Sequence, residues 1–153
     1  MTNNRINGEP VVVLLVEDND AHAELVKHSF EDHRIANKIY HVSDGEKAID
    51  YLFRRGDYAD PKKSPLPHVI LLDLRLPKID GLEVLKEIKT SKELDKIPTV
   101  IFTTSNAEID VAKAYDYRAN SYLVKPVDHE KFHQLLNGLG FYWLAWNYYP
   151  WGD

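Results

Sequence analysis

Residues 69–81 read VILLDLRLPKIDG and carry the strongest structural signal in the chain. Its first four residues, Val69 to Leu72, are apolar and run without a polar break into Asp73. Such an uninterrupted run is typical of a strand that is buried on both faces of a parallel sheet. We therefore expect the carboxylate of Asp73 to lie at the carboxyl end of a central strand.

Asp73 has two interpretations at this point. Ligands of open α/β sheets bind in the crevice beyond the carboxyl ends of the strands, so an acid there is a candidate functional residue. It could instead be a strand-ending residue whose carboxylate only accepts hydrogen bonds from nearby backbone amides.

The rest of the chain alternates similar strands with amphipathic helices. Further strands are predicted at residues 11–16, 38–42, 99–103 and 121–124. The segment 38–42 is more polar and suits a position near the sheet edge. Helical periodicity follows each strand, and the cap candidates are Asn19 or Asp20, residues 43–46, Asp80 with Glu83, Asn106, and Asp128. Five strands alternating with five helices predict an α/β fold with a parallel sheet and right-handed crossovers.

The helix predicted after Asp80 has a clear division between its two faces. Its inward positions are Leu82, Val84, Leu85 and Ile88, and its expected solvent-facing positions are Glu83, Lys86, Glu87 and Lys89. Lys92 and Lys96 continue this basic series, which we interpret as the hydrated face of the helix and its exit loop.

Length and composition favour one soluble domain. The chain has 153 residues, 44% hydrophobic residues, a net charge of −5 and no cysteine. This composition excludes disulfides and thiolate metal sites, and it argues against nucleic acid as the main partner. No signal peptide or membrane-spanning run is found, so a cytoplasmic location is expected. We divide the chain into a flexible lead at 1–10, a domain at 11–140 and an aromatic extension at 141–153.

Polar residues follow four of the predicted strands, at the positions Glu17, Asp18, Asp73, Thr103 and Lys125. Because the carboxyl ends of parallel strands meet at one edge of the sheet, these residues should converge in one crevice. Three close acids repel one another and call for a cation, and oxygen ligands beside a phosphate suit Mg²⁺.

The same set suits phosphoryl transfer. A lysine supplies positive charge for the transferring group, and a threonine hydroxyl can bond a phosphate oxygen. A carboxylate that attacks phosphorus would form an aspartyl phosphate, and Asp73 on the central strand is best placed to do so.

Residues 11–139 resemble the receiver domain of two-component response regulators. The matching residues are the acidic pair Glu17 and Asp18, the phospho-accepting Asp73, Pro77 and Gly81 beyond it, the switch hydroxyl Thr103, the switch aromatic Tyr122, and the pair Lys125 and Pro126. The family implies a flavodoxin-like (βα)₅ fold with strand order 2-1-3-4-5. It also implies a cis peptide bond before Pro126.

The resemblance assigns a role to each of these residues. Mg²⁺ would be bound by Glu17 or Asp18, by Asp73 and by the backbone carbonyl of Arg75. Of the acidic pair, Asp18 is the firmer ligand, because the longer Glu17 could reach the metal through water. A sensor histidine kinase or a phosphotransfer protein would supply the phosphoryl group.

In the phosphorylated state of the family, Thr103 would move toward the phosphate and Tyr122 would turn inward. These movements would change the face made by the fourth helix, fifth strand and fifth helix. Arg75, at the mouth of the crevice, could alter the rate of phosphate loss. The chain would act as a switch or relay intermediate and not as an enzyme on an external substrate.

Two other functions stay open. One is an Mg²⁺-dependent phosphohydrolase with an aspartate nucleophile, although Arg75 stands where such enzymes usually have a second acid. The other is an interaction module that is not phosphorylated. Only about 28 residues follow Lys125, so a stand-alone receiver is expected.

The outer segments carry further expectations. The proline-bearing loop 54–67 is either a surface insertion or an interaction loop. This loop and the aromatic extension resemble small regulators of bacterial phytochrome kinases. The extension could fold back on its domain or form a homodimer together with the fifth helix. His129 and His133 lie one helical turn apart and could bind a metal ion. We expect instead that they belong to a hydrated helix face.

Overall fold

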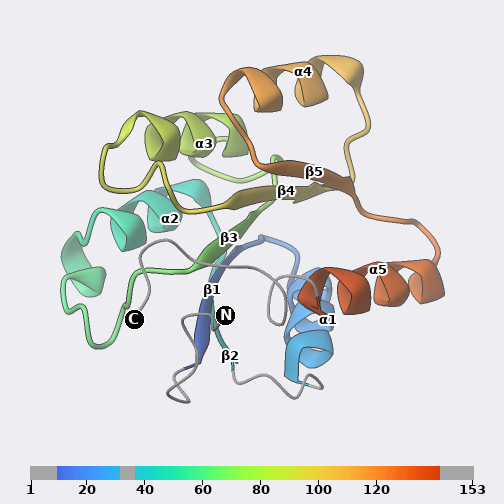
Figure 1. Cartoon of the computed structure of the whole chain (residues 1–153), viewed down its shortest axis with the longest axis horizontal. Helices are drawn as coiled ribbons and strands as arrows, with labels where there is room; N and C mark the ends of the chain where they lie inside the picture. Colours follow the sequence, from blue (N-terminus) through green and yellow to red (C-terminus); the bar gives the residue numbers. More distant parts are fainter. Residues whose placement is uncertain (1–9, 32–36, 142–153) are drawn as a thin grey trace, which may run out of the picture.

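The computed structural model describes residues 10–31 and 37–141. It has three layers, in which a parallel sheet lies between α1 and α5 on one face and α2, α3 and α4 on the other (Figure 1). The elements follow one another as β1 Val11–Val16, α1 Asp20–Glu31, β2 Asn37–Val42, α2 Gly45–Leu52, the 3₁₀ helix η1 Gly56–Tyr58, β3 Val69–Leu72, α3 Gly81–Thr90, β4 Thr99–Thr103, α4 Glu108–Asp116, β5 Ser121–Val124 and α5 His129–Phe141.

The five strands are parallel in the order β2-β1-β3-β4-β5, as the resemblance implied. Their register decides where the functional residues lie. Val16 at the end of β1 pairs with Leu72 at the end of β3, and Thr103 at the end of β4 pairs with Val124 at the end of β5. The residues that follow these strands therefore emerge at one edge of the sheet.

Two hydrophobic clusters cover the two faces of the sheet. Alternate residues of β1 point to opposite clusters, with Leu14 in one and Leu15 in the other. Every residue of β1, β3 and β4 is buried, whereas most of β2 is half-buried because it forms an edge of the sheet. The continuous apolar runs thus correspond to the central strands, as expected.

Several predicted caps are confirmed. The Asn19 Oδ1 accepts the His22 amide at 3.0 Å, and the Asp128 Oδ1 accepts the Lys131 amide at 3.1 Å. In the segment 43–46 the cap is Asp44, whose Oδ1 accepts the Lys47 amide at 2.7 Å, and not Ser43, as the capping-box pattern of Ser43 and Glu46 predicts. Each carboxyl or amide oxygen satisfies a backbone donor that has no partner within the helix.

Two predicted caps are wrong. Asp80 occupies the N-cap position of α3 but makes no side-chain cap bond, so no capping box with Glu83 forms. Asn106 does not cap α4, because the helix begins at Glu108. Near α4, Ser105 Oγ accepts the Ala107 amide at 3.3 Å.

The prediction that Lys89 faces solvent is also wrong, since this residue is 5% exposed. Its ammonium donates to the carbonyls of Asp95 and Ile97 at 3.1 Å each and to Asn120 Oδ1 at 2.9 Å. Two fixed acceptors in the α3–β4 connection and one just before β5 thus replace water around the cation. Helical periodicity alone could not reveal them, because they come from other segments.

The loop before β3 packs on the domain. Tyr51 in α2 donates its hydroxyl to the Pro65 carbonyl at 2.7 Å, and its ring packs on Tyr58 of η1 with 5.4 Å between the centroids. The extension at 142–153 lies outside the described residues.

Candidate functional site

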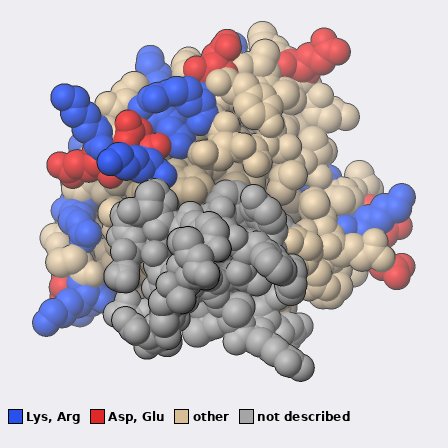
Figure 2. Space-filling view, viewed as in Figure 1, with Lys and Arg blue, Asp and Glu red and all other residues tan. Residues whose placement is uncertain are grey.

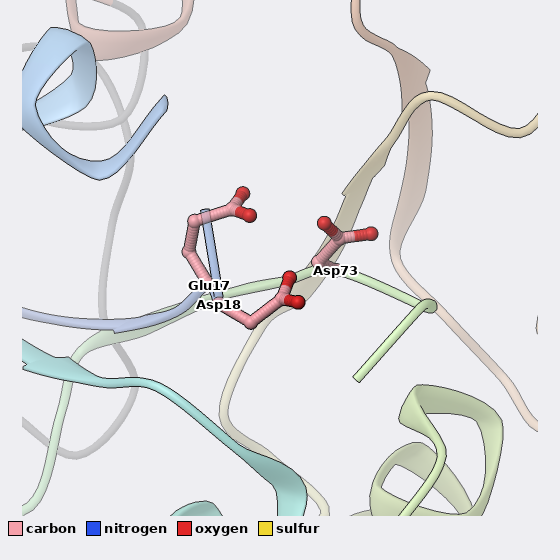
Figure 3. Close-up of side chains that lie close together, drawn as sticks. All are labelled: Glu17, Asp18 and Asp73. Carbon is pink, nitrogen blue, oxygen red and sulfur yellow. The ribbon is translucent and has the colours of Figure 1, made fainter. Parts of the chain in front are cut away.

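Three carboxylates meet at the edge of the sheet where β1 and β3 end. Ligand oxygens of Glu17, Asp18 and Asp73 all lie within 4.8 Å of one another, and Figure 3 shows them around one small region. Glu17 and Asp73 are buried, whereas Asp18 is exposed. In the described parts of the chain this is the one group of three or more acids, histidines or cysteines with metal-site spacing. His129 and His133 do not form one.

Lys125 provides the positive charge of the site. It follows β5, and its side chain is only 1% exposed. Its ammonium donates to Glu17 Oε1 at 2.5 Å and to Asp73 Oδ2 at 3.0 Å. Its backbone amide donates to the Thr103 carbonyl at 2.7 Å, which fixes the start of the segment after β5. The lysine therefore connects the ends of four strands.

His22 is a third neighbour of the Lys125 ammonium, and sequence reasoning missed it. Its Nδ1 lies 3.1 Å from Lys125 Nζ, so a neutral ring with its proton on Nε2 accepts the third N–H of the lysine. Burial and then the charge of Lys125 lower the pKa of His22, which favours this neutral form. The ring also packs on Phe132 of α5, with 5.3 Å between the centroids.

The site disfavours the ionised form of Glu17. Burial raises the pKa of Glu17 to about 7, Lys125 opposes this effect, and the Asp73 carboxylate adds to it. One ammonium therefore does not fully compensate the carboxylates around it. A bound divalent cation would supply the missing charge, and carboxylate oxygens are the ligands that Mg²⁺ and Mn²⁺ prefer.

Thr103 and Tyr122 meet at Ser105, in the segment between β4 and α4. Thr103 is fully buried, and its Oγ1 accepts the Ser105 amide at 3.4 Å. Tyr122 lies on β5 and donates its hydroxyl to the Ser105 carbonyl at 2.9 Å. The two residues expected to act as switches are thus joined through the backbone of one residue, Ser105.

Arg75 lies at the same edge, and its side chain is more constrained than a position at the crevice mouth suggested. Its amide donates to Asp73 Oδ1 at 3.3 Å, and its guanidinium donates to Asp110 Oδ2 of α4 at 2.6 Å. Asp110 was not predicted. It and Ala114 are the two buried residues of α4, and an acid on the buried side of a helix is the signal that could have identified it.

One implication of the resemblance is wrong in this structure. The described residues contain no cis peptide bond, so the bond between Lys125 and Pro126 is trans. The predicted residues at the strand ends are nevertheless brought together by the sheet. Glu17, Asp18, Asp73 and Lys125 form one cluster, and Thr103 adjoins it through the Lys125 amide.

Comparison with known proteins identifies a family with this fold. Residues 13–137 match the response regulator receiver domain family. The chain belongs to this family. Its parallel sheet of order 2-1-3-4-5 with five helices is the flavodoxin-like receiver fold.

Two relatives show how much of this receiver protein is shared. It is 43% identical over 142 residues to the probable methanogenesis regulatory protein FilR2 of Methanothrix harundinacea, covering 93% of this chain and 89% of the relative. It is 40% identical over 135 residues to response regulator Rcp1 of Synechocystis, covering 88% of this chain and 90% of the relative.

Two solved structures are similar to this receiver over almost their whole length. The Mn²⁺-bound form of Rcp1 superposes with a TM-score of 0.88 at 39% identity, covering 92% of this chain and 99% of that one. The phosphorylated cyanobacterial phytochrome response regulator RcpA gives a TM-score of 0.88 at 36% identity, covering 93% and 99%. In the described part of the receiver, no helix is long and apolar enough to cross a membrane.

Proposed function

We propose that this response regulator accepts a phosphoryl group on Asp73 and changes its binding surface in response. One observation carries the proposal: a buried lysine bonds Asp73 inside a group of three carboxylates at the edge of a parallel sheet. The structure of a phosphorylated relative supports it.

The residues of the site fit a bound Mg²⁺. Glu17, Asp18 and Asp73 would hold it together with the backbone carbonyl of Arg75, with Asp18 as the firmer ligand of the acidic pair. The ion would neutralise charge on the phosphoryl oxygens during transfer. The Mn²⁺-bound form of Rcp1 supports a divalent cation at this kind of site.

The chain's own residues would carry out the transfer. A carboxylate oxygen of Asp73 attacks phosphorus, forming the acyl phosphate O–P bond while the bond from phosphorus to the donor's leaving atom breaks. The leaving group takes the electron pair of that bond. Lys125, already 3.0 Å from Asp73, would balance charge on the phosphoryl oxygens. Later attack by water returns Asp73 and phosphate, so no external substrate is turned over and we do not class the protein as an enzyme.

The signal would be read through Thr103 and Tyr122. The Thr103 hydroxyl would bond the phosphoryl group, and Tyr122 would change position with it. The surface altered would be the one formed by α4, β5 and α5. Ile109 of α4 and Val124 of β5 are 62% and 40% exposed, which suits a binding surface.

Partner and location are part of the proposal. We infer a sensor histidine kinase or a phosphotransfer protein as donor, with a phytochrome kinase suggested by the likeness to Rcp1 and RcpA. The protein would act in the cytoplasm. Charges of both signs are interspersed over the described part of the face seen in Figure 2, and the net charge of −5 does not favour nucleic acid as a partner.

We also propose that residues 11–140 form the receiver domain, with a lead at 1–10 and an aromatic extension at 141–153. A homodimer would use α5 and this extension. Sedimentation would test this proposal by comparing the mass in solution of the full chain with that of a chain ending at residue 141. We expect a dimer for the full chain and a monomer for the shortened one.

The deciding experiment follows intact mass after incubation with a small acyl phosphate and Mg²⁺. We expect one added phosphoryl group in the wild type, no addition without a divalent cation, and no addition in Asp73→Asn. Multiple turnover of a phosphate ester would indicate a phosphohydrolase. A folded, Mg²⁺-binding protein with no adduct under rapid quench would favour a non-phosphorylated interaction module.

A further inference from the structure

Asp110 anchors the first turn of α4 to the loop after β3. Its side chain is 9% exposed, and its Oδ2 accepts both the Arg75 guanidinium at 2.6 Å and the Ser105 hydroxyl at 2.5 Å. A buried carboxylate is costly unless it is paired, so these two donors stabilise the Asp110 side chain in its buried position. We call Arg75, Asp110 and Ser105 the α4 anchor.

The α4 anchor touches both ends of the proposed switch. On one side, the Arg75 amide already donates to the acceptor carboxylate of Asp73 at 3.3 Å. On the other side, Ser105 bonds Tyr122 through its carbonyl and Thr103 through its amide. A continuous set of hydrogen bonds therefore runs from Asp73 to α4 and to both switch residues.

Arg75 is the movable member of this set. Its side chain is 60% exposed, while that of Asp110 is 9% exposed. A phosphoryl group carries about −1.5 to −2 charge at pH 7 and three strong acceptor oxygens. A guanidinium binds phosphate oxygens in a bidentate way that a single carboxylate oxygen does not match.

We propose that Arg75 exchanges Asp110 for the phosphoryl group on Asp73, and that this exchange releases α4 and Ser105. This inference rests on the proposed phosphorylation of Asp73. Once Arg75 leaves, Ser105 is the only side-chain partner that Asp110 retains among the described residues, and Asp110 must turn toward water. The first turn of α4 then shifts, and the Ser105 contacts with Tyr122 and Thr103 shift with it.

Reciprocity makes the exchange measurable. If the Arg75–Asp110 ion pair competes with the phosphoryl group, removing Asp110 must tighten the binding of a phosphoryl mimic. The tightening requires Arg75, because Arg75 is the group that is set free. A mutant cycle therefore separates this exchange from a general loosening of α4.

The experiment titrates beryllofluoride with Mg²⁺ into the wild type, Asp110→Asn, Arg75→Gln and the double variant, followed by calorimetry. We expect Asp110→Asn to bind the mimic about fivefold tighter than the wild type. Arg75→Gln and the double variant should bind with equal, weaker affinity. Glu46→Gln is the matched control, since Glu46 pairs with Lys78 at 3.4 Å on the surface and should change nothing.

Hydrogen exchange over residues 105–116 gives a second reading. The mimic should raise exchange in the wild type, and Arg75→Gln should show raised exchange with no further response. Because the Arg75 side chain is mostly exposed, Arg75→Gln should fold, and it tests the proposal even if Asp110→Asn does not fold. The proposal would be overturned if Asp110→Asn tightened binding of the mimic equally with and without Arg75. It would also be overturned if Arg75→Gln left the hydrogen exchange of residues 105–116 unchanged. A wild type that binds no beryllofluoride would instead reject the proposed function, and this inference with it.

Discussion

Two buried lysines show how the partners of a cation determine its role. Lys125 bonds two carboxylates that belong to the site, whereas Lys89 bonds two backbone carbonyls and one amide oxygen. Burial, and then the charge of Arg118, lower the pKa of Lys89 to about 8. The first lysine is suited to respond to charge at Asp73, and the second holds the α3–β4 connection in place.

Lys89→Met is expected to lower the free energy of unfolding at pH 7 by about 1–3 kcal/mol, because buried acceptors lose their donor. Folding lowers the pKa of Lys89 from 10.5 to about 8, so the unfolded chain binds more protons between these values. The wild type should therefore gain stability relative to the variant as pH rises from 8 to 10.5. Urea unfolding of the wild type and Lys89→Met between pH 8 and 10.5 measures this difference in unfolding free energy. If this difference did not change with pH, the lowered pKa of Lys89 would be contradicted.

Two close backbone contacts fix the elements around Asp73. A Cβ on Gly81, at the start of α3, would lie 2.2 Å from the Asp73 carbonyl oxygen, and one on Gly45, at the start of α2, would lie 1.9 Å from the Ile79 carbonyl oxygen. Both distances are shorter than real contacts allow. The N-termini of α2 and α3 thus pack directly against the segment that carries the proposed acceptor Asp73, and only glycine permits this.

Gly81→Ala should displace the Asp73 backbone, destabilise the protein by at least about 2 kcal/mol and slow phosphorylation. Gly138→Ala in α5 is the control, because its Cβ would meet nothing within 4 Å. That change should be neutral or stabilise by up to about 1 kcal/mol. Thermal unfolding and the rate of adduct formation are the measurements. A Gly81→Ala variant with both properties of the wild type would refute the close-contact argument.

At the scale of the whole molecule, the sheet assembles the site from four strand ends. β1, β3, β4 and β5 are adjacent and in register, so charged residues that are far apart in the sequence become neighbours. The concentration of negative charge that results is a property of the assembled sheet. It should therefore be visible in the stability of the entire domain.

Mg²⁺ is expected to stabilise the folded protein, because the unfolded chain has no acidic cluster. At about 100 times its dissociation constant, the gain in unfolding free energy should be about 2.7 kcal/mol. Asp18→Asn should remove most of this gain, while Glu24→Gln, an exposed acid paired with Lys27 in α1, should retain it. Thermal unfolding with and without Mg²⁺ gives the comparison. Equal stabilisation of the two variants would place the cation elsewhere.

Most of the fold could be predicted from local patterns. Continuous apolar runs mark strands buried on both faces, and their alternation with helical periodicity leaves a parallel sheet as the expected solution. Because parallel strand ends share one edge, the positions of Glu17, Asp18, Asp73 and Lys125 in the sequence were enough to predict their convergence.

The partners of individual side chains were decided only by the tertiary structure. The sequence by itself determined the strands, the helices and the acidic edge, because periodicity and chain order are local properties. It did not determine that Lys89 is buried or that Arg75 bonds Asp110. Those outcomes depend on donors and acceptors contributed by segments distant in the chain, and they exist only once the helices have packed on the sheet.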